Sequence, residues 1–400
     1  MPGVPAFGRN LWCLLTQNVF IFLGIALQAL ILNLYLVALG YREDFVGLLQ
    51  FAQTAAIGLA ALPAGSLAPR LGPRRMLIVA TAALGTSFAA MALIESPALL
   101  VAAAIVNGAS MASIFVPMAP YLMDNAAPEL RRTAFSANFA ALSLASVVGS
   151  ALGGQVPALI GGGDLNGYRA ALLVGASLTF LGIPPLLLAN DRRVAESMVP
   201  TTPAPVGGRV TTERIDTLAM CAATILMSAS TGLVVAFFNV YLRDQVHAST
   251  QTIGTIFAVA SLAMAPASLV APALSRRIGL VATIALSRIL CVPTIIALMF
   301  DPGLAIAALA YIGRSGFMSV GQPLDNAYVM ELYEPRKRAR VSALRTLSWN
   351  GGWAVATALG GIAIVNLGYH PIFLAAALLM LGSVIVHYMV FRGRDASPRA

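Results

Sequence analysis

Residues 11–36 read LWCLLTQNVFIFLGIALQALILNLYL, an apolar run of 26 residues without a charged side chain. About 18 or more such residues form a helix long enough to cross roughly 30 Å of hydrocarbon. The run is longer than the apolar part of a signal peptide and contains Gln17, Gln28 and Asn33. It therefore predicts a membrane-spanning helix that stays in the mature protein.

Eleven further runs of this kind follow, rich in Ala and Leu and without the alternation of barrel strands. The whole chain is 58% hydrophobic and only 10% charged, whereas soluble domains carry about 25% charged residues. We therefore predict an all-α membrane protein with twelve transmembrane helices, surrounded by the lipid bilayer. The predicted spans are 11–36, 45–67, 76–94, 97–122, 133–160, 168–189, 215–242, 252–274, 280–300, 304–329, 341–365 and 371–390.

The basic residues fall mainly on one side of these spans. If the N-terminus is cytoplasmic, 20 Arg and Lys residues lie on the cytoplasmic side and only Arg42, Arg169 and Arg243 lie outside. Because cytoplasmic loops are enriched in Arg and Lys, both termini are predicted to be cytoplasmic, in a bacterial inner membrane. The net charge of +9 is thus a topology signal. We expect no nucleic-acid partner and a monomeric protein.

A polar interruption at Asn190–Gly208, which holds three prolines, divides six spans from six. The two halves also repeat: Asn33-Leu34-Tyr35-Leu36 returns as Asn239-Val240-Tyr241-Leu242, at an offset of 241 − 35 = 206. A parallel repeat predicts two pseudo-symmetric six-helix bundles with a site between them. The predicted organisation is an N-terminal bundle (1–189), a cytoplasmic linker (190–213) and a C-terminal bundle (214–400).

The loop after the second span carries a recognisable motif, Gly65-Ser66-Leu67-Ala68-Pro69-Arg70-Leu71-Gly72-Pro73-Arg74-Arg75. It resembles the cytoplasmic signature of the major facilitator superfamily, with Pro69 where that family usually has Asp. The loop that begins at Asp124 is similar to the acidic and basic loop of the same family. The resemblance implies secondary transport by alternating access, with Asp124, Arg70 and Arg74 in gating.

Small residues recur in the fifth and eleventh spans. They resemble the Gly-x-x-x-Gly-Pro-x-x-Gly-Gly signature of drug and proton antiporters, although Ser150 replaces the proline. The alternative is close helix packing, which small residues at this spacing favour in any membrane bundle. The residues are Ala145, Gly149, Ser150, Gly153 and Gly154, and in the second half Gly352, Ala356, Thr357, Gly360 and Gly361.

Ionisable side chains inside the spans are the first functional candidates, because each costs at least about 2.5 kcal/mol to insert. Four lie in the C-terminal half: Arg288, Arg314, Asp325 and Arg345. At about 1.5 Å per residue, Asp325 lies roughly level with Arg288 and Arg345. We expect an ion pair that is structural or gating; alternatively Asp325 carries a coupling proton. No cofactor is expected besides an ion gradient, of protons.

Arg314 lies near the midplane, about 16 Å along the helix from Asp325, with no carboxylate at its depth. A polar stripe on its helix face suits a water-filled cavity. Its repeat mate is Asn107, since 314 − 107 = 207. We predict that Arg314 binds an anionic group of the substrate; alternatively, backbone carbonyls or hydroxyls satisfy it. The stripe comprises Tyr311, Arg314, Met318, Gln322 and Asp325.

Uncharged polar residues on two other spans complete the predicted binding site. Gln17, Gln28 and Tyr35 share one face of the first span, and Ser230 and Tyr241 lie on the seventh. Amides and phenols can bind many solutes, although interhelical hydrogen bonding is an alternative role for each.

The sequence has no Gly-rich nucleotide loop ending in Gly-Lys-Ser/Thr, and its three histidines lack partners at metal-ligand spacing. No nucleophile and base lie at one depth, so we predict a transporter and no enzyme; a channel or membrane enzyme is a remote alternative. The expected function is proton-coupled efflux of amphipathic or drug-like small molecules. The alternative is uptake or exchange of an organic anion through the central arginine.

Overall fold

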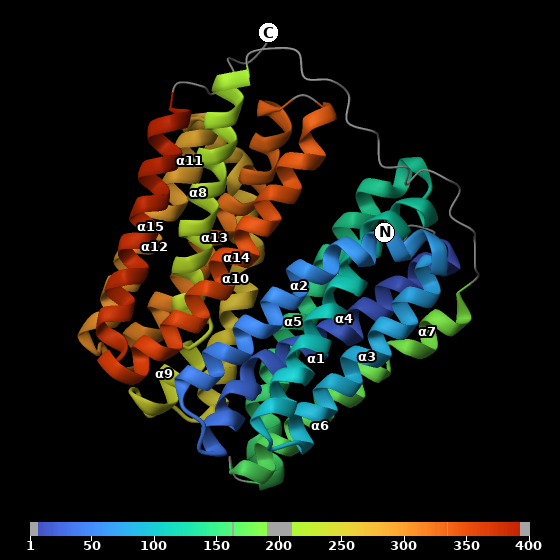
Figure 1. Cartoon of the computed structure of the whole chain (residues 1–400), viewed down its shortest axis with the longest axis vertical. Coiled ribbons are helices and arrows are strands. Elements are labelled where there is room, and N and C mark those ends of the chain that lie inside the picture. The colour runs from blue at the N-terminus through green and yellow to red at the C-terminus, as the bar shows by residue number, and fades with distance from the viewer. Residues whose placement is uncertain (1–6, 162–163, 190–209, 334, 393–400) are drawn as a thin grey trace, which may run out of the picture. The chain divides into compact units, whose positions relative to one another are not determined.

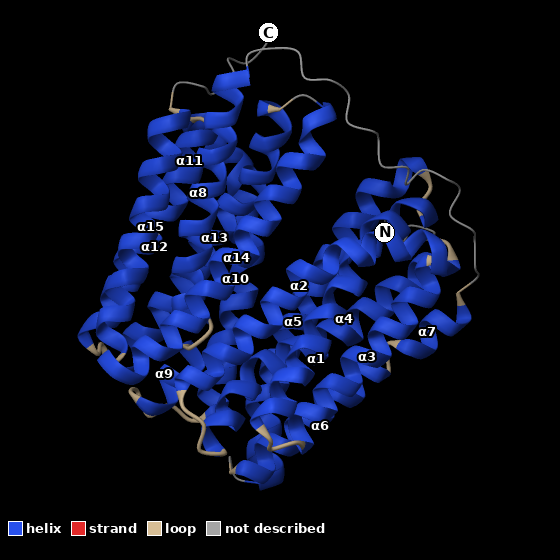
Figure 2. Ribbon diagram, viewed as in Figure 1, coloured by secondary structure: helices blue, strands red, loops and turns tan. Residues whose placement is uncertain are grey.

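The computed structural model describes residues 7–161, 164–189, 210–333 and 335–392. These residues form helices joined by short turns and contain no strand (Figures 1 and 2). Twelve of the helical segments are long and apolar enough to cross a membrane, which confirms the predicted fold class of an integral membrane protein. The elements are α1 (Arg9–Ala38), α2 (Glu43–Leu71), α3 (Pro73–Leu93), α4 (Pro97–Asn125), η1 (Pro128–Leu130), α5 (Arg131–Gly161), α6 (Leu165–Phe180), α7 (Ile183–Leu188), α8 (Val210–Val235), α9 (Phe238–Asp244), α10 (Thr250–Ile278), α11 (Leu280–Ile289), α12 (Cys291–Ala297), η2 (Leu298–Phe300), α13 (Gly303–Leu332), α14 (Pro335–Leu367) and α15 (Tyr369–Phe391).

Three spans that the sequence predicts as continuous helices are interrupted. The α6/α7 break precedes Pro184, and the α11/α12 break precedes Pro293. A proline lacks the backbone N–H and its ring clashes with the carbonyl four residues earlier, so the helix is interrupted there. The break between α8 and α9, at residues 236–237, involves no proline. Of the predicted linker, residues 190–209 lie outside the described residues, and α8 already begins at Val210.

Tight turns connect α2 to α3 and α10 to α11. Gly72 (φ 84°) and Gly279 (φ 89°) occupy them, at an offset of 279 − 72 = 207. A positive φ strains any residue with a Cβ, so glycine is favoured at both turns. The internal repeat is thus visible in the backbone as well as in the sequence.

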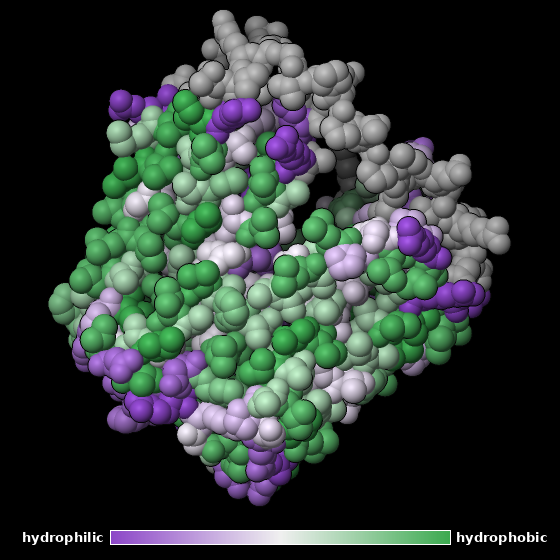
Figure 3. Space-filling view, in the orientation of Figure 1, coloured by the Kyte–Doolittle hydropathy of each residue, from purple (hydrophilic) through white to green (hydrophobic). Residues whose placement is uncertain are grey.

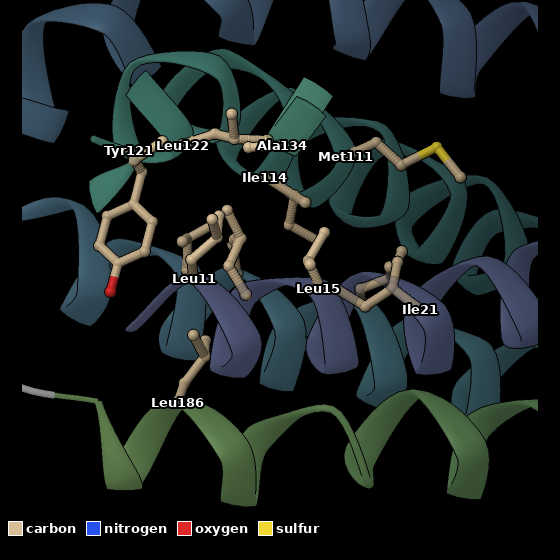
Figure 4. Close-up of a cluster of buried hydrophobic side chains, with 14 of the residues drawn as sticks. Leu11, Leu15, Ile21, Met111, Ile114, Tyr121, Leu122, Ala134 and Leu186 are labelled. Carbon is tan, nitrogen blue, oxygen red and sulfur yellow. The ribbon is translucent and has the colours of Figure 1, made fainter. Parts of the chain in front are cut away.

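The chain divides into two compact units. The first comprises residues 1–41, 52–202 and 249–258, and the second comprises residues 42–51, 203–248 and 259–400. In the first unit, a core of buried side chains from α1, α3, α4, α5, α6 and α7 includes Leu11, Leu15 and Ile21 (Figure 4). In the second, α8 packs against both α14 and α15.

The small residues of the fifth and eleventh spans lie where helices approach closely. A Cβ on Gly149 would lie 2.6 Å from the carbonyl oxygen of Leu23, between α5 and α1. A Cβ on Gly352 would lie 2.1 Å from Ser228 Oγ, between α14 and α8. These contacts give the small residues a packing role in both units.

Large apolar side chains are exposed along the helices, among them Leu62 at 85% and Leu269 at 79%. Figure 3 shows hydrophobic surface over the middle of the helices and hydrophilic patches near their ends. Such a surface is stable only where lipid covers it, because water would not tolerate this much exposed hydrocarbon.

Candidate functional site

Three charged side chains of the second unit meet inside the membrane-spanning region. Asp325 on α13 forms an ion pair with Arg288 on α11, through Oδ2 and Nη2. Arg345 on α14 places its Nη2 at 3.7 Å from the same oxygen. The three side chains are 10%, 3% and 14% exposed respectively. The sequence predicts that Asp325 pairs with either arginine, and in the structure its carboxylate lies close to both. The gating or coupling role of the three residues stays a prediction.

Hydrogen bonds tie this charge cluster (Arg288, Asp325 and Arg345) to two further helices. Arg288 Nη1 donates to Ser383 Oγ on α15 at 3.2 Å. Ser383 in turn donates to the carbonyl oxygen of Ala223 on α8 at 2.8 Å. Five helices of the second unit are thus connected through the cluster.

Sequence reasoning missed His387, which lies one turn beyond Ser383 on α15. The side chain is buried, and its ring centroid lies 6.0 Å from that of Tyr328 and 5.2 Å from that of Phe391. Its Nε2 has no hydrogen-bond partner within the described residues. The available signal was a histidine inside the last apolar run, which a search for metal-ligand spacing does not detect.

A small hollow adjoins the Arg288–Asp325 pair. Met318 and Gln322, which the sequence predicts as binding residues, thus lie beside the charge cluster. Met227 of α8 lines the same hollow from another helix. The hollow is too tight to admit a water molecule in this structure, so thioether, amide and charged groups are closely packed there. It is lined by Met227, Ser287, Arg288, Met318, Gly321, Gln322 and Asp325.

Arg314 lies on α13, eleven residues before Asp325, and is only 3% exposed. Its Nε and Nη2 have no hydrogen-bond partner within the described residues. The expected alternative, in which carbonyl or hydroxyl groups satisfy the guanidinium, does not apply to these two nitrogens. Tyr311, one turn earlier, stacks on Phe238 with centroids 4.2 Å apart.

The predicted polar residues of the first unit lie between helices. Asn107 on α4 accepts a hydrogen bond from Gln53 Nε2 at 2.8 Å and donates to Ser87 Oγ at 3.0 Å. Gln17 donates to Thr81 Oγ1 at 3.0 Å, and Gln28 donates to the sulfur of Met91 at 3.2 Å. All three predicted residues are buried. These bonds give each an interhelical role, and their contact with a solute stays a prediction.

Tyr35, Ser230 and Tyr241 likewise donate to main-chain carbonyls of neighbouring segments. The acceptors are Ala92 at 2.8 Å, Ala376 at 2.7 Å and Leu298 at 3.3 Å. All three residues are fully buried. The structure does not gather these three around the hollow described above.

The residues that the family resemblance assigns to gating differ in their surroundings. Arg74 donates from Nε and Nη2 to the carbonyl oxygens of Leu186 and Leu187, at 2.7 and 2.8 Å, and so caps the end of α7. Arg70 is exposed. Asp124 lines a cavity of about 440 Å³ between the start of α1 and the α4–α5 connection. Within the described residues, no three His, Cys, Asp or Glu side chains gather closely enough to hold a metal ion.

Comparison with known proteins gives a family and a fold. The family model described as Major Facilitator Superfamily matches residues 14–213 and 220–400. The nucleoside transporter NupG is similar in structure, with a TM-score of 0.76 at 13% identity over 95% of this chain and 99% of that one. A bacterial homologue of the human lysosomal transporter Spinster gives a TM-score of 0.76 at 15% identity over 98% of both chains. Comparison with curated protein sequences gives no match. At these identities the two structures show the fold alone.

Proposed function

Because the chain belongs to the Major Facilitator Superfamily, and is thus a membrane transporter, we propose that it exports amphipathic small molecules in exchange for protons. Alternating access around a site near the midplane is the mode of transport that this fold favours. Export is supported by the resemblance of the fifth span to drug and proton antiporters. The exported class, the direction and the proton are the parts of this proposal that need experiment.

The observation that carries proton coupling is the shared carboxylate of Asp325. In its ionised form it attracts Arg288 and Arg345, which lie on helices either side of it in sequence. A proton on Asp325 removes that attraction from both guanidinium groups at once. The contacts that hold α11, α13 and α14 together then change, so the protonation state of one side chain alters the packing of the unit.

Solute binding and protonation have a physical reason to influence each other. The hollow is lined by Gln322 and Met318 and also by both members of the ion pair. A solute that enters it when these closely packed side chains move apart contacts the groups whose charges the proton changes. Binding of the solute and of the proton are then linked, and linkage of this kind is reciprocal.

The test uses purified full-length protein in liposomes with an imposed pH gradient. Two amphipathic probes, the cation ethidium and the anion 2-naphthoate, are followed by fluorescence. We expect the gradient to drive accumulation of at least one probe against its own gradient by the parent protein. Asp325→Asn, isolated as its monodisperse fraction, is expected to equilibrate the same probe without concentrating it.

Asp301→Asn is the matched control, because Asp301 is 59% exposed and pairs with His370 at the surface of the same unit. It should accumulate probe as the parent does. If Asp325→Asn still concentrates the probe under the gradient, Asp325 is not the coupling residue. If the parent only equilibrates both probes at every gradient, proton-coupled export is wrong.

A further inference from the structure

We infer that Arg314 binds the acidic group of the transported solute, which makes the solute an amphipathic organic anion. This inference rests on the proposed transport function and adds the chemical class of the substrate. It starts from a charge imbalance in the second unit. Three arginines, Arg288, Arg314 and Arg345, lie well inside its spans together with Asp325, whereas the other buried carboxylate, Asp216, is only the third residue of the span Arg214–Asp244.

Asp325 does not compensate Arg314. Its carboxylate is already paired with Arg288 and approached by Arg345. It also lies eleven residues from Arg314 on the same helix, or about 16 Å at 1.5 Å per residue. Arg314 makes no ion pair within the described residues, and its Nε and Nη2 are buried without a hydrogen-bond partner.

A buried guanidinium with open donors is unfavourable, because only a partner of opposite charge offsets the free energy of hydration lost on burial. A residue kept for packing would not need this charge. The two open nitrogens, Nε and Nη2, are the pair that forms two parallel hydrogen bonds with one carboxylate or phosphate group. The geometry therefore favours an oxyanion that arrives from outside the protein.

The position of Arg314 separates a transported solute from a bound lipid. It is the twelfth residue of a span that covers Gly303–Val329, close to the middle of the membrane-crossing segment. Lipid phosphates lie near the ends of such a segment. We therefore expect an oxyanion at the level of Arg314 to belong to a solute that has moved away from the membrane–water interface.

The rest of the solute can be placed along the same face of α13. Met318 lies one turn from Arg314, and Gln322 lies two turns away. Both line the closely packed hollow to which Met227 of α8 also contributes, so a solute enters it only when these side chains move apart. Thioether side chains adapt to apolar shapes of different outline, and the amide of Gln322 provides one polar contact. The expected ligand thus has one anionic head and a compact apolar body.

The test measures binding to purified full-length protein by isothermal titration calorimetry. The probes are 2-naphthoate, phenylphosphonate and decanoate as anions, and 2-naphthamide as the uncharged counterpart of the first. The parent is expected to bind at least one anion, and to prefer 2-naphthoate to the amide. Arg314→Lys keeps the charge but loses the planar fork, and should weaken binding of that anion roughly 10- to 100-fold. Arg243→Lys is the control, because Arg243 lies beside Asp244 at 3.7 Å and outside the proposed site.

A second measurement separates a ligand-binding arginine from a structural one. Arg314→Met removes a buried charge whose donors are open, so without probe its apparent melting temperature should equal or exceed that of the parent. The bound anion should raise the melting temperature of the parent and leave that of Arg314→Met unchanged. A structural arginine gives the opposite result, a variant that melts well below the parent.

The inference is overturned if the parent binds none of the three anions, if Arg314→Lys binds the anion as the parent does, or if Arg314→Met is strongly destabilised. These results leave the proposed function standing where the liposomes still accumulate ethidium under a pH gradient. Loss of ethidium and 2-naphthoate accumulation with intact anion binding would instead count against the proposed function alone.

Discussion

The charge cluster of Arg288, Asp325 and Arg345 predicts an unequal response to loss of each member. Asp325→Asn leaves two guanidinium groups facing each other, one of them 3% and the other 14% exposed. Removing one partner of a buried ion pair costs about 3–5 kcal/mol. We expect this variant to lose that much of its free energy of unfolding, because among the described residues neither arginine has another carboxylate as an ion-pair partner.

The two arginines should matter less, and in a fixed order. Arg288→Met leaves Asp325 with Arg345 at 3.7 Å, so part of the cost is offset and we expect a loss of about 1–3 kcal/mol. Arg345→Met removes a longer and more exposed contact, for which about 1 kcal/mol or less is typical. The double variant Asp325→Leu with Arg288→Met replaces the pair by apolar groups and should recover much of the loss of Asp325→Asn.

The assay is unfolding of the purified protein in mixed micelles by SDS titration, followed by circular dichroism. Each variant is compared with the parent at the same protein and detergent concentration. Two results would refute the reasoning. One is an Asp325→Asn variant whose free energy of unfolding lies within about 0.5 kcal/mol of that of the parent, because loss of a buried ion-pair partner should cost several kcal/mol. The other is an Arg345→Met variant that loses more stability than Arg288→Met.

Two further predictions concern helix packing in the first unit. Asn107→Leu leaves Gln53 with only the weak acceptor Met111 Sδ and removes the donor to Ser87, so the same titration should show a loss of about 1–3 kcal/mol; stability equal to that of the parent would contradict the interhelical role. Gly149→Ala forces a Cβ to within 2.6 Å of a backbone oxygen and should cost about 1–3 kcal/mol. Gly65→Ala, whose Cβ would have its nearest neighbour at 3.9 Å, is the control and should be at least as stable as the parent, because alanine favours the helix.

The parts of this fold that the sequence predicts are those set by single helices. A membrane-crossing helix requires a long apolar run, so counting such runs gives the twelve spans that the structure confirms. The depth of a residue in the membrane likewise depends on its position along a single helix. The fixed rise per residue therefore predicts that Asp325, Arg288 and Arg345 lie at similar levels, and the structure brings them together.

The rotation of each helix about its axis cannot be predicted in this way. Asn107 and Gln28 could face either a cavity or a neighbouring helix, and the spacing of residues on one span does not distinguish the two. In the structure both donate to residues of α3. His387 escaped notice for a related reason, since Tyr328, its ring neighbour, comes from another span 59 residues earlier, 387 − 328 = 59.

We expect the buried guanidinium groups of the second unit to make transport responsive to the membrane potential. Moving one elementary charge through a potential difference of 100 mV changes its free energy by about 2.3 kcal/mol. Any step that carries Arg314 through part of that field is therefore faster or slower according to the voltage. A bound anion at Arg314 reduces the charge that moves, so the loaded step should respond to voltage less than the empty one. In liposomes with a potassium gradient and valinomycin, transport should thus become voltage-dependent where return of the empty protein limits the rate.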